Sequence, residues 1–154
     1  MQQMWEIRQM IALAMLAICA YTDIKEKCIY LMPLIITGTG SVIISVIEMT
    51  ASGDGDTVHI LISNIVLPIL AGAFLIAVSY ITKEYMGPGD GYLLAALGLA
   101  TGIRSGLLSF AAGMVMISLY AATILLCKKS RSVNSVPMAP FVMSGYFMVL
   151  INEI

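Results

Sequence analysis

Charged residues are scarce in this chain. Only 11% of its 154 residues are Asp, Glu, Lys or Arg, whereas 60% are hydrophobic and the mean hydropathy is +0.96. A soluble domain is nearer a quarter charged. The 8 basic and 9 acidic residues give a net charge of −1, too weak and too scattered for a nucleic-acid surface. The composition therefore indicates an integral membrane protein whose partners are lipid or apolar segments.

Metal ligands and the common nucleophile motifs are also lacking. His59 is the single histidine, and Cys19, Cys28 and Cys127 form no C-x-x-C pair. The sequence therefore offers no zinc site, and we expect buried free thiols and no metal or other cofactor. Neither G-x-S-x-G nor H-E-x-x-H occurs in the chain. Among catalytic mechanisms, an aspartyl mechanism is what these absences leave.

Long apolar runs separated by short polar segments predict an all-α fold. We expect one polytopic membrane domain over residues 1–154, with about six transmembrane helices. The expected spans are residues 5–21, 29–47, 58–81, 92–103, 107–127 and 137–151. The first has no small-residue cleavage site, so we expect it to be retained. Small residues that favour close helix packing lie in or beside the fourth and fifth spans: Gly98, Gly102, Gly106 and Gly113.

Basic residues concentrate in alternate loops. Those that follow the first, third and fifth spans are Lys25, Lys27, Lys83, Lys128, Lys129 and Arg131. The opposite side has only Arg8, Arg104 and the acidic loop 51–56. The positive-inside rule then makes the basic loops cytoplasmic and puts both termini outside.

Two aspartates lie at the ends of apolar runs, where a carboxylate is costly and usually functional. Asp90 lies within Gly87-Pro88-Gly89-Asp90-Gly91, where glycines allow another backbone to come close. The predicted topology puts Asp23 and Asp90 on one cytoplasmic face. Two neighbouring carboxyls share a proton, so one can act as base on a water while the other acts as acid. The alternatives are an interfacial charge for Asp23 and a helix N-cap for Asp90.

Three segments resemble the type IV prepilin peptidases, which are GxGD aspartyl membrane peptidases. Residues 87–90 (Gly-Pro-Gly-Asp) and the apolar segment 93–98 resemble the GxGD segment of that family. Residues 23–29 (Asp-Ile-Lys-Glu-Lys-Cys-Ile) resemble its first-aspartate segment, and 136–141 (Val-Pro-Met-Ala-Pro-Phe) its C-terminal motif. Their order and spacing agree over nearly the whole chain.

The resemblance implies the GxGD aspartyl protease fold and an aspartic-type endopeptidase of the bacterial cytoplasmic membrane. Such an enzyme removes the basic leader of a type IV prepilin at the cytoplasmic face, just before the prepilin's apolar helix. Asp23 and Asp90 correspond to the catalytic pair. Residues that bind substrate or shape the site are then Gly87, Pro88, Gly89, Gly91, Lys27, Lys83, Pro137 and Pro140. The lysines also fix topology, and proline is common in the first turn of any helix.

The chain departs from the family pattern in three respects. Tyr92 stands where many relatives have Lys, and Tyr30 where they have Pro. The cytoplasmic N-terminal segment with paired cysteines is not present, so we expect a peptidase-only member like those that serve tight-adherence (Flp-type) pili. Two other functions stay open: a small transporter or channel subunit, in which membrane acids bind ions, and a catalytically silent pilus-assembly partner. A transporter needs acids nearer the bilayer centre than these helix ends.

Overall fold

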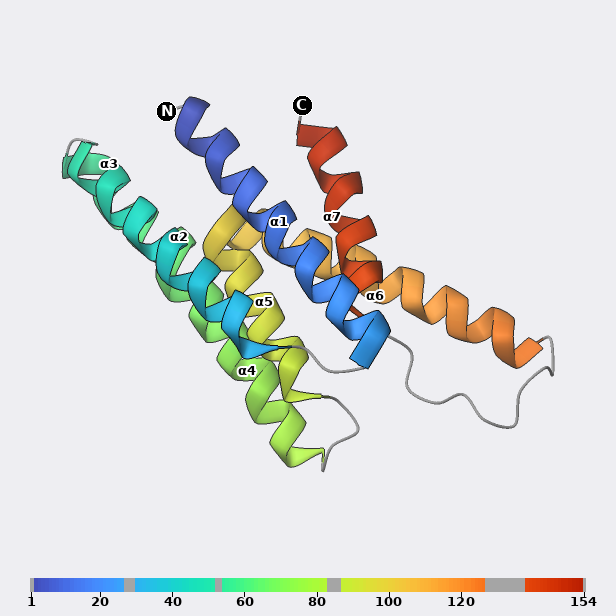
Figure 1. Ribbon diagram of the computed structural model, residues 1–154. Coiled ribbons are helices and arrows are strands. Elements are labelled where there is room, and N and C mark those ends of the chain that lie inside the picture. The colour runs from blue at the N-terminus through green and yellow to red at the C-terminus, as the bar shows by residue number, and fades with distance from the viewer. Residues whose placement is uncertain (1, 27–29, 52–53, 83–86, 127–137, 154) are drawn as a thin grey trace.

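The computed structural model describes residues 2–26, 30–51, 54–82, 87–126 and 138–153 (Figure 1). Every regular element in these residues is a helix: α1 (Gln2–Glu26), α2 (Leu31–Ala51), α3 (Asp54–Leu61), η1 (Ile62–Val66), α4 (Leu67–Ile81), α5 (Pro88–Thr101), α6 (Ile103–Leu126) and α7 (Ala139–Glu153). Since α3, η1 and α4 follow one another without a break, the described chain forms six rods. The predicted all-α bundle is therefore confirmed.

Four helical segments are long and apolar enough to cross a membrane: Trp5–Glu26, Leu31–Thr50, Thr57–Ile81 and Ile103–Ile124. The segment Ala139–Asn152 is apolar but shorter. Large apolar side chains, such as Met32, Phe74 and Leu119, are exposed on the outer surface. This pattern is expected where lipid rather than water covers the helices, and the chain is a membrane protein.

The helices run between two ends of the bundle, and we call these the site end and the far end. The C-terminal ends of α1 and α4 and the N-terminal ends of α2 and α5 lie at the site end, low in Figure 1. The labelled chain termini lie at the far end (Figure 1). Asp23, near the end of α1, and Asp90, near the start of α5, are therefore at the same end.

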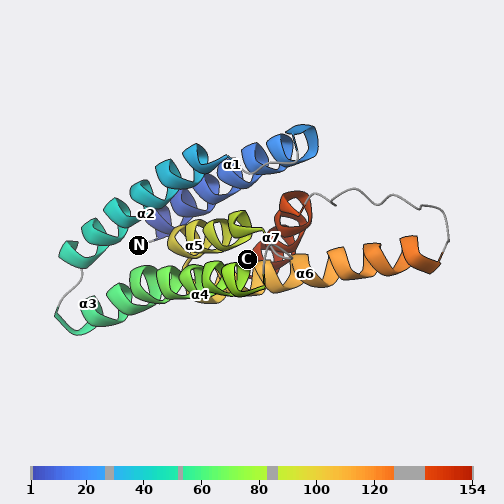
Figure 2. The ribbon, with the colours of Figure 1, turned by 90° about the horizontal axis from the view of Figure 1, so that it is seen from below.

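Helix α5 occupies the middle of the bundle. It contacts α1, α2, α4 and α6, and Figure 2 shows it between the layer of α1 and α2 and the layer of α4 and α6. Its buried residues are Gly91, Leu93, Leu94, Ala96, Leu97, Gly98, Leu99 and Ala100. At 14 residues, α5 is much shorter than α1 with 25, and it is enclosed by protein rather than by lipid.

Glycines bring α4 and α5 into direct backbone contact. A Cβ atom on Gly72 would lie 2.5 Å from the Cβ of Ala95, and one on Gly91 would lie 2.6 Å from Cγ1 of Ile76. A Cβ on Gly98 would approach Pro68 to 2.9 Å. The helices can come this close only because these side chains are absent.

The same device joins α6 to its neighbours. A Cβ on Gly106 would lie 2.8 Å from the Cα of Gly98, and one on Gly113 would lie 2.7 Å from the Cα of Val142 in α7. On α7, a Cβ on Gly145 would lie 2.5 Å from the carbonyl oxygen of Ser109. The packing role predicted for Gly98, Gly106 and Gly113 is therefore seen in the structure.

Pro68 explains the π-helical segment η1 inside the third rod. A proline ring inside a helix clashes with the carbonyl four residues earlier and has no N–H to donate. In η1 the backbone hydrogen bonds span five residues instead of the usual four, and the N–H of Leu67 donates to the carbonyl of Ile62. A widened turn of this kind takes up the misfit without ending the helix.

The turn between α5 and α6 differs from its prediction. We expected a polar loop over 104–106, but Gly102 alone separates the two helices, so Arg104 lies in the first turn of α6. Gly102 has φ 85°, a conformation that favours glycine because it has no Cβ. Gly102 also allows a close approach, because a Cβ there would lie 3.2 Å from Oδ1 of Asn64.

Gly72→Ala should lower the stability of the bundle by about 1–3 kcal/mol, because the added methyl group meets Ala95 and the backbone of Gly91. Gly40→Ala in α2 is the matched control, since no atom lies within 4 Å of its added Cβ. Thermal unfolding in detergent micelles measures both. Equal unfolding temperatures for the two variants would contradict the close contact of α4 and α5.

Candidate active site

Asp23 lies in the last turns of α1 and is only 6% exposed. Its Oδ2 accepts a hydrogen bond of 2.9 Å from the backbone N–H of Ala139. Ala139 is the first residue of α7, and Pro140 after it has no N–H to satisfy. Asp23 therefore caps the N-terminus of α7, where the helix dipole and the N–H donor stabilise a negative charge.

Asp90 lies in the first turn of α5, before the apolar stretch of that helix. Gly87 precedes the helix in an extended conformation, and Pro88 is its first residue, where the fixed φ of proline favours helix initiation. The N–H of Asp90 donates to the carbonyl of Gly87 at 3.1 Å. Burial, and then the negative charge of Asp23, raise the pKa of the Asp90 carboxyl to about 6.

The charge of Asp23 acts on the Asp90 carboxyl, although 67 positions (90 − 23) separate the two residues in the chain. Asp23 accepts a backbone hydrogen bond from Ala139. Partial burial of Asp90 favours its neutral form. An acid whose pKa is raised, beside a second carboxyl that accepts a hydrogen bond, is the kind of pair that can act as acid and base in one reaction.

The structure distinguishes the roles of the other residues in the glycine-rich segment. Gly91 faces α4, where its missing side chain admits Ile76 and the carbonyl of Gly72. A Cβ on Gly87 would have no atom within 4 Å, so close packing does not require glycine there. Gly87 contributes the extended backbone before the helix. Gly89 lies between Pro88 and Asp90 in the first turn of α5.

The remaining predicted site residues fall into two groups. Pro140 is the second residue of α7, directly after the N–H that Asp23 binds. Lys27, Lys83 and Pro137 lie outside the described residues.

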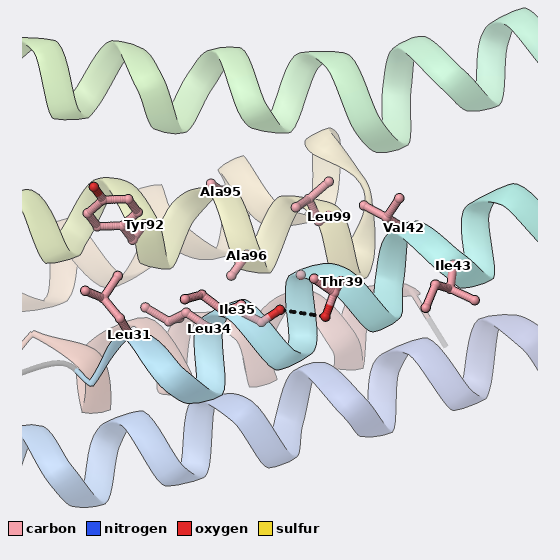
Figure 3. A pocket seen from close by; sticks show the side chains of 11 residues that line it. Leu31, Leu34, Ile35, Thr39, Val42, Ile43, Tyr92, Ala95, Ala96 and Leu99 are labelled. Atoms are coloured by element: carbon pink, nitrogen blue, oxygen red, sulfur yellow. Dashed lines mark hydrogen bonds between the residues drawn. The ribbon is translucent and has the colours of Figure 1, made fainter.

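The two departures from the family pattern have definite positions. The Tyr30 hydroxyl donates to Oε2 of Glu26, so it links the start of α2 to the end of α1. Tyr92 is half-exposed and lines an apolar cavity of about 740 Å³ between α2 and α5 (Figure 3). Both tyrosines therefore lie at the surface of the bundle rather than in its core.

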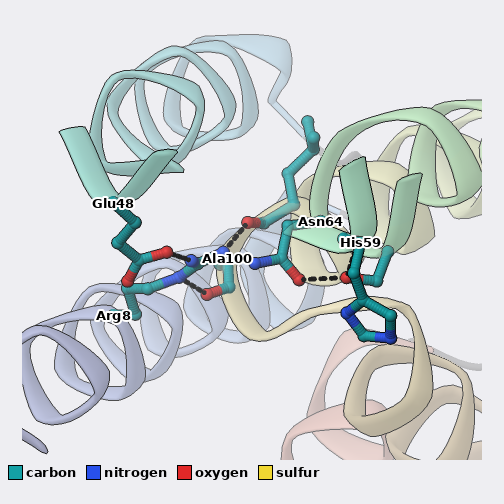
Figure 4. A network of polar contacts seen from close by, with 7 residues as sticks. Arg8, Glu48, His59, Asn64 and Ala100 are labelled. Carbon is teal, nitrogen blue, oxygen red and sulfur yellow. Dashed lines mark hydrogen bonds and ion pairs between the residues drawn. The ribbon is translucent and has the colours of Figure 1, made fainter. Parts of the chain in front are cut away.

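A buried ion pair at the far end of the bundle holds the other end of α5 (Figure 4). Arg8 is 6% exposed, and its Nη1 lies 2.6 Å from Oε2 of Glu48 in α2. Its Nε and Nη2 donate to the carbonyls of Ala100 and Leu99, each at 2.9 Å. These are carbonyls of the last turn of α5, which have no partner within the helix.

Sequence reasoning missed this arrangement because it treated Arg8 only as a topology signal. A usable signal was present, since Arg8 and Glu48 are isolated charges at the edges of two apolar runs on the same predicted side. Opposite charges in that setting are expected to pair.

Of the remaining candidate ligands in the described residues, Cys19 lies one turn before Asp23 in α1, and His59 lies in α3. His59 is exposed in α3, and its carbonyl accepts from Ser63 (Figure 4). Cys19 is a buried free thiol, as predicted, whereas Cys28 and Cys127 lie outside the described residues. Within the described part of the chain, no group of three or more His, Cys, Asp or Glu side chains could hold a metal ion.

Comparison with known families agrees with the sequence motifs. The sequence model of the type IV leader peptidase family matches residues 10–122, a segment that contains Asp23, Asp90 and the glycines around Asp90. The chain belongs to the type IV leader peptidase family. This leader peptidase is therefore a hydrolase of the membrane. Comparisons with curated proteins and with solved structures gave no significant match.

Asp23→Ala should lower the stability of this leader peptidase by about 1 kcal/mol, because the N–H of Ala139 loses its acceptor. Asp23→Asn should unfold close to the wild type, since an amide oxygen can still accept this hydrogen bond. Thermal unfolding in detergent compares the two variants. If both unfold at the same temperature, the cap contributes nothing to stability.

Proposed function

We propose that this leader peptidase is an aspartic-type endopeptidase that cleaves the leader of type IV (Flp/Tad-like) prepilins, with Asp23 and Asp90 as the catalytic pair. One observation carries the proposal. The carboxyls come from the ends of two different helices at one end of the bundle, and the charge of Asp23 acts on Asp90 to raise its pKa. That coupling is the property a shared-proton dyad requires.

The environments of the two acids assign their roles. Asp23, which accepts the N–H of Ala139, is the base that takes a proton from water. The oxygen of that water attacks the peptide carbonyl, and Asp90 donates its proton to the carbonyl oxygen. When the tetrahedral intermediate collapses, the C–N bond breaks and the leaving amine takes the proton held by Asp23. The hydroxyl proton of the collapsing intermediate returns to Asp90, which restores the starting state.

The distribution of basic residues supports an orientation for this chemistry. Six basic residues follow the first, third and fifth predicted spans, which end on the side of Asp23. We infer that this side faces the cytoplasm of a bacterium and that both termini lie outside. A basic leader on the cytoplasmic side would then reach the pair while the rest of the prepilin stays in the membrane.

Asp23→Asn and Asp90→Asn should each reduce leader cleavage by on the order of 10²–10⁴, because each removes one partner in proton transfer. Cleavage of a co-expressed Flp-type prepilin is scored by the size of the product on gels. Glu26→Gln is the matched control, since Glu26 is an exposed acid one turn from Asp23. Full cleavage by either aspartate variant, at wild-type protein level, would refute the pair.

The pH profile follows from the raised pKa of Asp90. Its protonated form is the active acid, so kcat/KM for leader cleavage should fall as pH rises through about 6. In Asp23→Asn, loss of the neighbouring charge should move the Asp90 titration to lower pH. Infrared absorption of the protonated carboxyl, measured against pH, reports the Asp90 titration directly. The spectrum of Asp90→Asn is subtracted as the reference. An unchanged titration in Asp23→Asn would contradict the coupling.

A further inference from the structure

An apolar groove runs along the bundle beside the candidate active site. It lies between α2 and α5 and has a volume of about 740 Å³ (Figure 3). Along α2 it extends from Leu31 to Ile43, which corresponds to about 18 Å of helix. We call it the α2–α5 groove.

The lining of the α2–α5 groove restricts what it can hold. The hydroxyl of Thr39 is used by its own helix, since it donates to the carbonyl of Ile35 at 2.8 Å. Apart from Tyr92, the other side chains that line the groove are hydrocarbon. The side chains that line the groove offer few partners for polar backbone groups. Its occupant is therefore an α-helix, which pairs these groups internally, or a lipid chain, which has none, rather than an extended peptide.

The position of the groove favours a helix over a lipid chain. Its α5 side is lined by Tyr92, two positions after Asp90, and by Ala95 and Leu99 of the same helix. A substrate helix seated there lies beside the proposed catalytic pair, whereas a lipid chain gains nothing from that position.

One end of the groove lies at the site end of the bundle. Leu31 is the first residue of α2, and Tyr92 follows Asp90 by two positions, so one end of the groove opens at the end of the bundle where the aspartates lie. A second apolar depression, lined by Trp5, Met10 and Leu150 among others, lies between α1 and α7. Its lining begins near the start of α1, at the far end, so it has no comparable connection to Asp90.

We propose that the α2–α5 groove holds the apolar helix of the substrate, with the scissile bond at Asp90 and the helix passing Tyr92 and then Thr39. This inference rests on the proposed function, because it takes the substrate to be a membrane-embedded prepilin. The groove then sets the register of cleavage, since a helix seated along it presents only the residues just before its start to the aspartates.

Thr39→Trp tests the proposal, because an exposed side chain in the middle of the groove becomes large without disturbing the core. Thr123→Trp is the matched control, since Thr123 is equally exposed on α6 and does not line the groove. With purified Flp-type prepilin in proteoliposomes, Thr39→Trp should raise KM about tenfold and leave kcat nearly unchanged. Ile35→Trp should do the same, and Thr123→Trp should match the wild type. Unchanged KM in both groove variants would overturn the proposal.

A photo-crosslinking residue at position 39 or 123 in the Asp90→Asn background identifies the occupant directly. The expected product joins position 39 to the apolar segment of the prepilin, with none from position 123. Crosslinking of position 39 to lipid alone would show a lipid site and overturn the proposal. If the wild-type enzyme cleaves prepilin while the groove variants behave normally, the proposed function stands and the groove assignment fails. If the wild-type enzyme does not cleave prepilin, the proposed function fails.

Discussion

The bundle depends on how the C-terminal end of α5 is satisfied inside protein. A helix that ends away from water leaves carbonyls without partners, and neither lipid nor apolar side chains can supply donors. Arg8 meets this requirement for Leu99 and Ala100, and Glu48 balances the charge that Arg8 brings with it. Because Arg8, Glu48 and the two carbonyls belong to α1, α2 and α5, the Arg8 side chain joins these three helices at the far end.

The site end is held by a different interaction, and it involves the proposed base itself. Asp23 joins α1 to α7 through the N–H of Ala139, and farther along the same two helices Tyr146 bonds to Gln9. A carboxylate that caps a helix is held in one orientation without substrate. No helix in the described residues is shown to be capped by Asp90, and burial raises the pKa of its carboxyl. The asymmetry between the two acids is thus a consequence of which helix ends they occupy.

Much of this arrangement could be predicted from the sequence, because it depends on local patterns. Apolar runs located the rods, alternation of loops brought Asp23 and Asp90 to one end, and the Gly-Pro-Gly segment marked a helix start. Long-range partners could not be predicted in this way. Nothing near Asp23 in the sequence indicates that it binds the N–H of Ala139, and nothing near Arg8 identifies the carbonyls of Leu99 and Ala100. The one-residue turn at Gly102 could not be predicted either, since the apolar pattern hardly changes between the end of α5 and the start of α6.

The shortness of α5 links its packing to the chemistry. Fourteen residues make a helix of about 21 Å, shorter than the roughly 30 Å hydrocarbon core that a lipid-exposed helix must cross. Such a helix is usable here because other helices enclose it, so its polar ends meet protein groups rather than lipid. Its first turn is consequently shielded by longer neighbours, and shielding is the first cause of the raised pKa of Asp90. A helix of full span would carry the same acid out to bulk water, where its pKa would be ordinary and its protonated form would be lost at lower pH. Enclosure of α5 therefore supplies both the packing that the glycines require and the acid that the proposed reaction needs.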